Sequence, residues 1–398
     1  MKKLLIIGAS VLQLPAIKRA KEMGLEVAVA DYNPNAVGIK YADYYYNAST
    51  IDENAITRVA TEYRPDGIMT LATDMPMRSV AASTSALKLP GISMDTAIKA
   101  TDKGEMIKAF KAYDVESPWY YIVNNKKKLM EIKHMLSYPC IVKPTDNAGS
   151  RGVMLIEDEC ELKKAFAYSS KEGRSGSVII EEYMTGNEVS VEIIVYKGHV
   201  HILSITDKLT TGAPHFVELG HNQPSLLPTS DQDKIKDLAS RAVKAIGLTD
   251  GPAHVEIMLT NDGPKMIELG ARMGGDCITT HLVPLSTGID MIKATIDICL
   301  GNEPELTKKF QKGSAIRFLS PKKGMVKEIN GLQEALNSKG IIDIDIPITT
   351  GSVISEIKSS IDRSGYVIAQ GEDALDAIDK CNVATGLIEI VTENESKR

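Results

Sequence analysis

The sequence predicts a mixed fold, in which an α/β unit with a parallel sheet is followed by α+β units. The first hundred residues alternate short apolar runs with helical stretches, an order typical of a right-handed parallel α/β sheet. From Tyr138 onward the apolar runs are rich in β-branched residues and are joined by short turns, as in antiparallel strands. A length of 398 residues gives room for two to four domains of about 100–200 residues each.

The N-terminal unit begins with Leu4–Gly8, a continuous apolar run of the kind that is buried on both faces of a parallel sheet. Helical spacing over Pro15–Met23 stops at Gly24, a residue that commonly ends helices. Two further strands, and the helix that leads into the next unit, are expected at Val27–Ala30, Gly67–Leu71 and Lys103–Tyr113.

The rest of the chain is expected to hold short strands and a few helices. Strands are expected at Pro139–Val142, Val153–Ile156, Val178–Glu182, Glu188–Val195, Ala253–Leu259 and Lys265–Leu269. Helices are expected at Glu161–Tyr168, Ser230–Ile246 and Ile289–Leu300. The last hundred residues should mix short strands with one helix at Glu372–Cys381.

The composition argues against several classes of protein. The balance of 46 basic against 52 acidic residues gives a net charge of −6, which offers no broad electrostatic surface for nucleic acid. No apolar run approaches the roughly 18 residues that span a bilayer. The five cysteines are scattered without a Cys-x-x-Cys pair, which argues against a disulfide scaffold or a zinc ribbon. We therefore expect a soluble, cytoplasmic protein that binds neither nucleic acid nor membrane.

The turn Gly8-Ala9-Ser10 follows a strand and precedes a helix, as in a dinucleotide site. The dinucleotide fingerprint needs three glycines, but Ser10 and Gln13 stand where the second and third belong. Bulky side chains there keep the backbone away from a pyrophosphate. We therefore favour a structural turn, and interpret the spacing to Asp31 only as a sign of a Rossmann-like fold.

A loop of small residues, Asn147–Gly152, lies between two expected antiparallel strands and close to Lys143. Such a loop can direct backbone N–H groups at an anion, and a lysine ammonium adds a compact positive charge beside it. Taken alone, however, a loop of this composition is more often a plain hairpin.

Glu256 and Glu268 lie on two strands on either side of the turn at Asn261–Gly263. If the hairpin is symmetric about Asp262, the two carboxylates are directly opposite each other on one face, with Cβ atoms about 4.5–5.5 Å apart. Like charges so placed are destabilising unless a cation lies between them, and Mg²⁺ typically binds one or two carboxylates plus phosphates. The alternative is an exposed pair that points into water.

In this order, the loop, the paired acids and the flanking motifs resemble the ATP-grasp superfamily of carboxylate–amine ligases. The resemblance implies a Rossmann-like domain over residues 1–100 and an ATP-grasp domain over 101–304, with a mobile lid at about 115–185. It further implies a C-terminal domain over 305–398, similar to that of biotin carboxylase.

The resemblance assigns ATP contacts to the residues that match family motifs. These are Lys103, Lys143, Ser150, Arg151, Gly152, Glu181, Glu182, Tyr183, Met184 and Glu188. The lysines and the loop would contact phosphates, the four residues from Glu181 would hold adenine, and Glu188 would bind the ribose.

Glu256 and Glu268 match the two magnesium ligands of the family, and Arg272 matches the arginine beside the reacting phosphoryl group. One position departs from the family pattern: an Asn usually stands two residues after the second acid as a third metal ligand, whereas this chain has Gly270. Either a second metal is then held more weakly, or His254 across the hairpin helps to orient a ligand or substrate.

Two segments, His215–His221 and Gly251–Glu256, are similar to the amino-acid ligase branch of the superfamily. The first belongs to the longer segment His215–Gln223. By its composition it should be a polar, mobile loop and would usually be a solvated turn. The resemblance places it over the acyl-phosphate site, where Glu218 or His221 would bind the amino group or accept its proton.

The function implied by the resemblance is an ATP-dependent carbon–nitrogen ligase. It would use ATP with Mg²⁺, or Mn²⁺ in its place, and would join a small carboxylate to an amine, amino acids among them, as a monomer or a homodimer. The alternatives are an ATP-grasp carboxylase, an enzyme similar to phosphoribosylglycinamide synthetase, an NAD-dependent oxidoreductase and a non-catalytic ATP-binding protein.

Overall fold

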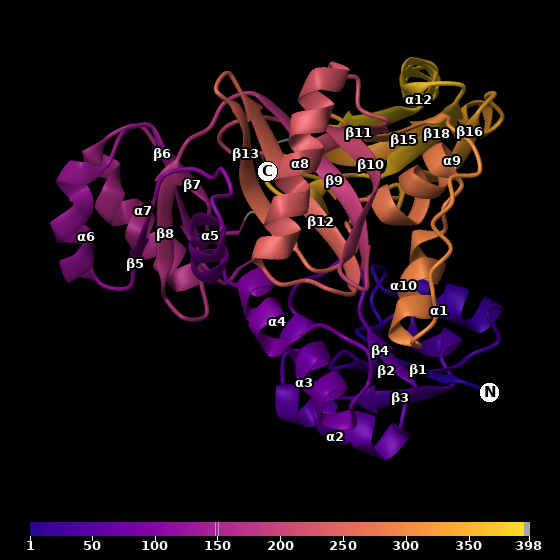
Figure 1. Cartoon of the computed structure of the whole chain (residues 1–398). Coiled ribbons are helices and arrows are strands. Elements are labelled where there is room, and N and C mark those ends of the chain that lie inside the picture. The colour runs from indigo at the N-terminus through magenta and orange to yellow at the C-terminus, as the bar shows by residue number, and fades with distance from the viewer. Residues whose placement is uncertain (148, 150, 394–398) are drawn as a thin grey trace.

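The computed structural model describes residues 1–147, 149 and 151–393, and has the mixed α/β architecture that the sequence predicts (Figure 1). An N-terminal unit lies at the bottom of Figure 1, a lobe of residues 120–182 projects to the left, and the larger body carries the remaining strands. We call this lobe the lid, after the lid that the resemblance predicts at about 115–185. The predicted loop residue Ser150 lies outside the described residues.

The N-terminal unit is built on a parallel sheet with strand order β3-β2-β1-β4. Its strands are β1 (Lys3–Ile7), β2 (Glu26–Asp31), β3 (Tyr44–Asn47) and β4 (Gly67–Met69). The helical segments here are α1 (Leu14–Glu22), η1 (Ile39–Tyr41), α2 (Glu53–Tyr63) and α3 (Met77–Leu87). The strands are almost entirely buried except β3, as the continuous apolar runs predict.

Two helices lead out of this unit, α4 (Met94–Thr101) and α5 (Lys103–Ala112). Asp102 separates them and caps α5, because its side chain accepts hydrogen bonds from the N–H groups of Gly104 and Glu105. This cap fixes Lys103 at the first residue of α5.

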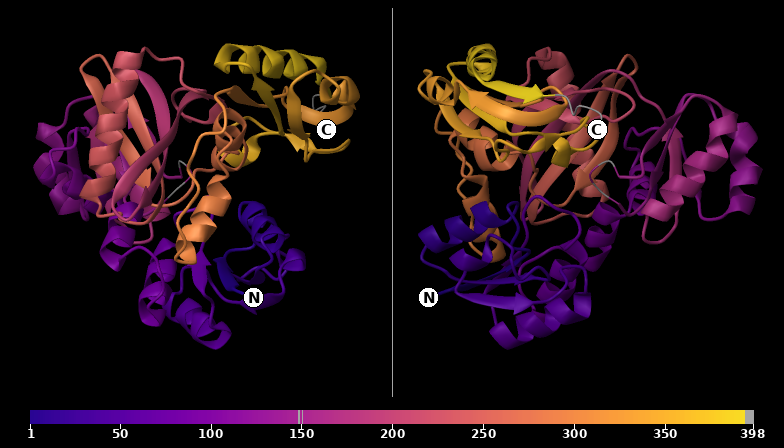
Figure 2. Two further views of the ribbon diagram at one scale, coloured as in Figure 1. Left: turned by 45° about the vertical axis from the view of Figure 1, so that its right-hand side comes forward. Right: turned by 180° about the vertical axis from the view of Figure 1, so that it is seen from behind.

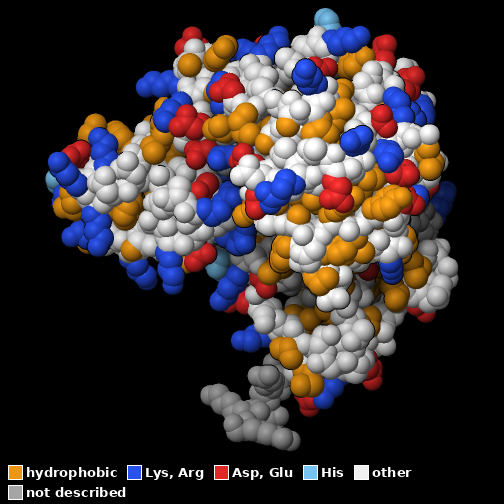
Figure 3. Space-filling view, turned by 90° about the horizontal axis from the view of Figure 1, so that it is seen from below, with side chains coloured by type: hydrophobic (Ala, Val, Ile, Leu, Met, Phe, Trp, Pro, Cys, Tyr) orange, Lys and Arg blue, Asp and Glu red, His pale blue; other side chains and the backbone are white. Residues whose placement is uncertain are grey.

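The lid contains an antiparallel sheet with strand order β5-β8-β6-β7. Its elements are β5 (Tyr120–Val123), α6 (Lys126–Ile132), η2 (Lys133–Met135), β6 (Cys140–Pro144), β7 (Met154–Ile156), α7 (Glu159–Glu172) and β8 (Val178–Glu182). Lys126, Lys127 and Lys128 are exposed at its outer end, and Figure 3 shows Lys and Arg side chains gathered on the projecting lobe.

The main sheet has the strand order β13-β12-β9-β10-β11-β14-β18-β16. Its strands are β9 (Asn187–Tyr196), β10 (His199–Thr210), β11 (Glu218–Gln223), β12 (Gly251–Thr260), β13 (Gly263–Gly270), β14 (Gly313–Phe318), β16 (Ile341–Asp345) and β18 (Tyr366–Gly371). The chain between β11 and β14 also forms α8 (Thr229–Ala245), the π-helical turn η3 (Ile278–Leu282), α9 (Val283–Thr287) and α10 (Met291–Cys299). Helix α8 packs its apolar side on the strands β12 and β13.

The C-terminal region adds a small sheet with strand order β17-β15-β19. Its elements are β15 (Gly324–Asn330), α11 (Leu332–Leu336), β17 (Val353–Ile354), η4 (Ser360–Asp362), α12 (Ala374–Leu387) and β19 (Glu389–Glu393). The predicted boundary at residues 304 and 305 falls between α10 and β14, yet strands from both sides of it share the main sheet. Figure 2 shows this last region and the N-terminal unit on the same side of the molecule, with α10 between them.

Two predictions about elements were wrong. Instead of a loop, Glu218–Gln223 is the strand β11, inside the main sheet between β10 and β14. The C-terminal region also contains the short helix α11 beside the longer helix that was expected. Within the described residues, no helix is both long and apolar enough to cross a membrane.

Candidate active site

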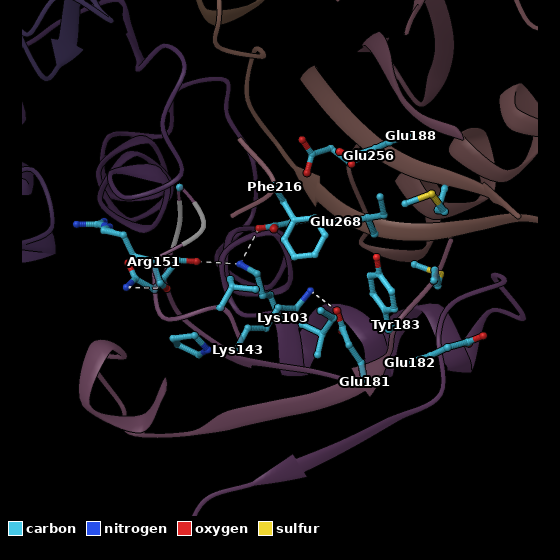
Figure 4. Close-up of a pocket in the computed structure, with 18 of the residues that line it drawn as sticks. Lys103, Lys143, Arg151, Glu181, Glu182, Tyr183, Glu188, Phe216, Glu256 and Glu268 are labelled. Carbon is cyan, nitrogen blue, oxygen red and sulfur yellow. Dashed lines mark hydrogen bonds and ion pairs between the residues drawn. The ribbon is translucent and has the colours of Figure 1, made fainter. Parts of the chain in front are cut away.

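A cavity of about 190 Å³ lies between the lid and the main sheet (Figure 4). The residues predicted from sequence that line it are Lys103, Lys143, Arg151, Glu181, Glu182, Tyr183, Met184, Glu188, Glu218, Glu256 and Glu268. Gly152, His221 and Arg272 are not among the described residues that line it. The structure therefore brings most of the predicted set together from the lid, α5 and the main sheet.

Gly152 has a structural reason for being glycine. Its φ is +81°, a region that residues with a side chain rarely adopt, and a Cβ there would lie 2.7 Å from Cγ of Pro144. It therefore closes the turn between β6 and β7.

The hairpin of β12 and β13 places Glu256 directly opposite Glu268, and His254 opposite Gly270, which confirms the predicted pairing. The predicted symmetry fails nearer the turn, where Ile257 pairs with Met266 and Ile267 is an extra residue. Such a bulge re-aims side chains, and Ile267 lines the cavity beside Glu268 instead of joining the buried apolar face.

Each of these two acids has a basic partner. Lys103 Nζ lies 2.8 Å from Glu268 Oε1 and also donates to the backbone oxygen of Asn147 at 2.8 Å. Burial opposes the charge on Lys103, but the neighbouring Glu268 outweighs burial and raises the pKa of Lys103. The ammonium is therefore charged at the point where the lid loop meets the hairpin.

Lys208 on β10 is the residue that sequence reasoning missed. Its Nζ lies 2.6 Å from Glu188 Oε1, 2.7 Å from Glu256 Oε1 and 3.7 Å from Glu218 Oε1, and its side chain is 3% exposed. Burial opposes its charge, but the three carboxylates raise its pKa well above the usual value. Because these acids come from β9, β11 and β12, no local pattern in the sequence indicates the cluster.

His254 is a second buried cation at the hairpin. Its Nδ1 lies 3.0 Å from both carboxylate oxygens of Glu192, and its Nε2 lies 3.4 Å from Glu256 Oε1. Burial would lower the pKa of His254, but Glu192 outweighs burial and raises it to about 9. The pKa of Glu256 is correspondingly well below its usual range, since Lys208 and His254 outweigh its burial.

The other end of the cavity is more apolar. Tyr183 and Phe216 line it with their ring centroids 6.2 Å apart, and Met258 and Ile267 complete that wall. Glu181, which also lines the cavity, forms an ion pair with Lys143 on the neighbouring strand β6. The side chain of Glu182 instead pairs with Lys265 at 2.9 Å and points away from Glu181 (Figure 4).

Arg272 lies just beyond the hairpin and is held by the N-terminal unit. Its Nε and Nη2 donate to the two carboxylate oxygens of Asp74 at 2.9 and 3.0 Å. The same pair explains Gly270, because a Cβ on Gly270 would lie 2.6 Å from Asp74 Oδ1 and 3.0 Å from Arg272 Nε. The position of the usual asparagine is thus taken by an ion pair that links two units of the chain.

Glu218 and His221 lie on the same strand but in different surroundings. Glu218 lines the cavity, whereas His221 is 1% exposed, packs its ring against Phe318, and has Nε2 3.4 Å from Asp276 Oδ2. Asp276 in turn accepts hydrogen bonds from both terminal nitrogens of Arg363 at 2.7 Å. Burial opposes the charge on Asp276, but the hydrogen bonds from Arg363 and His221 outweigh burial and lower its pKa.

The polar groups of the turn after β1 are hydrogen-bonded by side chains of the turn and of β2. Asp31 Oδ2 accepts a hydrogen bond from the N–H of Ala9 at 2.8 Å, and Gln13 Oε1 accepts from the hydroxyl of Ser10 at 2.7 Å. A Cβ on Gly8 would lie 2.8 Å from the same Gln13 oxygen. The carboxylate that would bind a ribose is thus already hydrogen-bonded, and the Gln13 side chain fills the space beside Gly8.

In the described part of the chain, no cluster of three or more His, Cys, Asp or Glu is arranged to hold a metal by itself. A cation at Glu256 and Glu268 would therefore need further ligands from a bound molecule, as Mg²⁺ does when it binds phosphates.

Two regions of the chain match known families. Residues 136–280 match the ATP-grasp domain, and residues 317–393 match the L-amino acid ligase C-terminal domain 2. The uncharacterized protein y4rH of Sinorhizobium fredii is 27% identical over 286 residues, which cover 71% of this chain and 59% of y4rH. The chain thus spans less than two thirds of that relative.

Solved structures resemble the whole fold. Phosphoribosylglycinamide synthetase from Anaerococcus prevotii is 26% identical with a TM-score of 0.80, covering 98% of this chain and all of that one. L-amino acid ligase from Bacillus licheniformis is 22% identical with a TM-score of 0.85, and 99% of each chain is covered. The second likeness, at this identity, concerns the fold alone.

Proposed function

Because this chain belongs to the ATP-grasp family of ligases, we propose that it joins a substrate carboxylate to an amine at the expense of ATP, releasing ADP and phosphate. One observation carries the proposal: two acids face each other across a hairpin, each has its own lysine partner from another element, and a third lysine, Lys143, lines the same cavity. The C-terminal match to L-amino acid ligases favours amino acids as the substrates.

The residues of the cavity fit ATP and a divalent cation. The apolar wall at Tyr183 and Phe216 suits an aromatic base, and the basic end at Lys103 and Lys143 suits phosphates. Glu256 and Glu268 would hold Mg²⁺ or Mn²⁺, because opposed carboxylates offer the hard oxygen ligands that these ions take together with phosphates. When bound, the ion neutralises charge on the transferred phosphoryl group.

In the first step, a carboxylate oxygen of one substrate attacks the γ-phosphorus, the bond to ADP breaks, and an acyl phosphate forms. Lys103 and Lys143 hold the phosphates in position, which is the main requirement of phosphoryl transfer. Arg272, aligned by Asp74, lies next to the hairpin and can bind the carboxylate or the phosphoryl group. The lid, about residues 115–185, closes over the site and excludes the water that would hydrolyse the acyl phosphate.

In the second step, the amine nitrogen attacks the acyl carbon and inorganic phosphate leaves. Glu218 lines the cavity and would accept the proton that the amine loses. His221 is too buried for that task and acts through its contact with Asp276, as a positioning residue.

Other functions fit the structure less well. The Asp31 carboxylate already accepts hydrogen bonds from the N–H groups of Ala9 and Asn33, and Gln13 stands in place of a glycine, which disfavours an NAD-dependent oxidoreductase. A non-catalytic ATP-binding protein would not need the paired acids Glu256 and Glu268 together with Arg272 just beyond the same hairpin. A ligase for phosphoribosylamine and glycine remains the second candidate, because the A. prevotii structure covers the whole chain.

The test is to measure phosphate release and amide formation for pairs of amino acids with ATP and Mg²⁺, and with phosphoribosylamine and glycine in a parallel arm. For the pair that reacts, Glu268→Gln should lower the ATP turnover by at least about 100-fold, since it removes one charged ligand that acts in the transition state. The circular dichroism spectrum should stay unchanged.

Asp262→Asn is the matched control, because Asp262 is exposed at the turn of the same hairpin and is not among the described residues that line the cavity. Turnover in this variant should stay within a few-fold of the unmodified protein. Wild-type turnover in Glu268→Gln, or no consumption of ATP with any substrate pair, would contradict the proposed function.

A further inference from the structure

A second cavity, of about 450 Å³, lies between the N-terminal unit and the C-terminal region. The first cavity, between the lid and the main sheet, is called the nucleotide cavity below. None of the described residues that line the second cavity also lines the nucleotide cavity. The two cavities are neighbours all the same. Gly274 in its wall is two residues after Arg272, and Ser360 in its wall donates a hydrogen bond to Glu218 in the nucleotide cavity at 3.3 Å.

One wall of the second cavity is apolar. It is formed by Val11, Leu12, Pro15, Leu71, Ala72, Phe318 and Pro347. Val11 and Leu12 are 66% and 42% exposed, although they follow directly on a turn whose other side chains are buried or hydrogen-bonded. Two adjacent exposed aliphatic side chains facing a cavity gain stability when an apolar group covers them.

The charged groups of this cavity are already paired or lie at its edge. The carboxylate of Asp276 accepts hydrogen bonds from both terminal nitrogens of Arg363, so the charges of the two groups compensate each other. His281 has its pKa lowered by burial, and its ring is therefore neutral near pH 7. Asp345 is exposed. An acidic side chain would thus find no unpaired cation among the described residues of this wall, and desolvating it would be unfavourable.

We infer that this cavity binds the side chain of one of the two substrates and selects an aliphatic or aromatic one. The inference rests on the proposed ligase function and names the class of substrate. The carboxylate that is activated and the amine that attacks can both carry such a side chain, since both groups must meet beside Arg272. Each methylene group buried against the apolar wall should strengthen binding roughly fourfold.

The experiment varies one amino acid at a time while the other is held constant, so that the donor and the acceptor are tested separately. The series is glycine, alanine, valine, leucine and phenylalanine, with aspartate and lysine as charged members. For one of the two positions, KM should fall stepwise from glycine to leucine or phenylalanine, and aspartate and lysine should be the poorest substrates.

Leu12→Asp should raise the KM for leucine or phenylalanine at least tenfold while the KM for ATP and for glycine stays within twofold. Leu375→Asp is the matched control, because Leu375 is 59% exposed on α12 and lines neither cavity. A preference for aspartate or lysine, or equal kinetics in Leu12→Asp and Leu375→Asp, would overturn the inference even if ligation proceeds.

Calorimetric titration separates this inference from the proposed function. Leucine or phenylalanine should bind in the presence of Mg²⁺ and a non-hydrolysable ATP analogue, and Leu12→Asp should weaken that binding at least tenfold. Such binding without amide formation would support the cavity assignment and count against the ligase. Absence of any binding that depends on Leu12 would overturn the cavity assignment itself.

Discussion

Lys208 shows how much of this site depends on a single side chain. Its ammonium is almost fully buried and contacts Glu188 and Glu256 at 2.6 and 2.7 Å. Glu218, at 3.7 Å, is the third acid around the same ammonium. A cation that arrives with ATP would bind beside a cluster that already carries one positive charge. Lys208 therefore sets both the distances between the acids and the net charge of the cluster.

Replacing Lys208 with Met should destabilise the fold by about 3 kcal/mol, because a buried charge pair then loses one partner. Mg²⁺ with an ATP analogue should restore part of this stability, and should raise the melting temperature of Lys208→Met more than that of the unmodified protein. Lys208→Arg is the control, and without ligand its free energy of unfolding should stay close to that of the unmodified protein. Equal ligand-induced shifts in all three proteins would show that Lys208 does not substitute for the bound cation.

Gly270 is a second residue whose identity matters. A Cβ at this position would lie 2.6 Å from Asp74 Oδ1, so an asparagine would push Asp74 and Arg272 apart before it could reach a metal. We expect Gly270→Asn to lower ATP turnover by about tenfold or more. The Mg²⁺ concentration that gives half of the maximal turnover should not fall.

The comparison for this prediction is Asp74→Asn, which keeps the size of the side chain but removes its charge and replaces one acceptor oxygen by an N–H₂ donor. Both variants should lose turnover to a similar extent, because both release Arg272 from its carboxylate. If Gly270→Asn instead gains activity and binds Mg²⁺ more tightly, the asparagine has become a metal ligand and our explanation of Gly270 is wrong.

At the scale of elements, the strands of the site were predictable where local pattern decides them. The hairpin of β12 and β13 is confirmed because apolar residues flank a turn of Asn, Asp and Gly. The bulge at Ile267 was not predicted, since either register of the turn suits the same residue types. Register near a turn depends on contacts with the neighbouring strands, which the local sequence does not contain.

Strand β11 was missed for a related reason. Its residues His221, Asn222 and Gln223 are polar yet buried, at 1%, 8% and 0% exposure. Their partners come from elsewhere in the chain: Gln223 donates to Thr206 at 2.8 Å and Asn222 donates to Asp207 at 2.9 Å. A polar strand in the middle of a sheet is stable when such partners exist, and local composition does not reveal them.

Asp276, the partner of His221 on β11, leads to a prediction about pH. The pKa of Asp276 is below its usual value in the folded protein, so its ion pair with Arg363 adds stability above the unfolded pKa of about 4. This contribution is lost as the pH falls from about 5 through the acid range. We expect the urea midpoint of Asp276→Asn to fall less between pH 6 and pH 3 than that of the unmodified protein.

Asp233→Asn is the control for this titration, because Asp233 lies on the surface of α8 with a single exposed lysine partner. Its urea midpoint should follow the unmodified protein at every pH. An identical pH dependence for Asp276→Asn and the unmodified protein would show that this ion pair does not contribute.

At the scale of the whole molecule, the lid carries a built-in reporter. Trp119 is the only tryptophan in the sequence, lies directly before β5, and accepts a hydrogen bond from the N–H of Glu182 at 3.0 Å. Because the proposed closure of the lid moves this strand relative to the main sheet, Mg²⁺ and an ATP analogue should change the tryptophan emission. Glu268→Gln should need a higher concentration of Mg²⁺ for the same change.

A Trp119→Phe variant should show no such change in tryptophan emission, which identifies the source of the signal. An unchanged emission in the unmodified protein at saturating nucleotide, with binding verified by calorimetry, would contradict lid closure around this strand.

The main sheet has a consequence for how the chain is made. Strand β11 pairs on one side with β10 and on the other with β14, and β14 in turn pairs with β18. During synthesis the residues of the nucleotide cavity leave the ribosome well before β14 and β18 do. Until those strands arrive, the open edge of β11 presents unpaired backbone groups that can pair with other chains. The chain therefore exposes this strand edge until its C-terminal region has been synthesised and has paired with it.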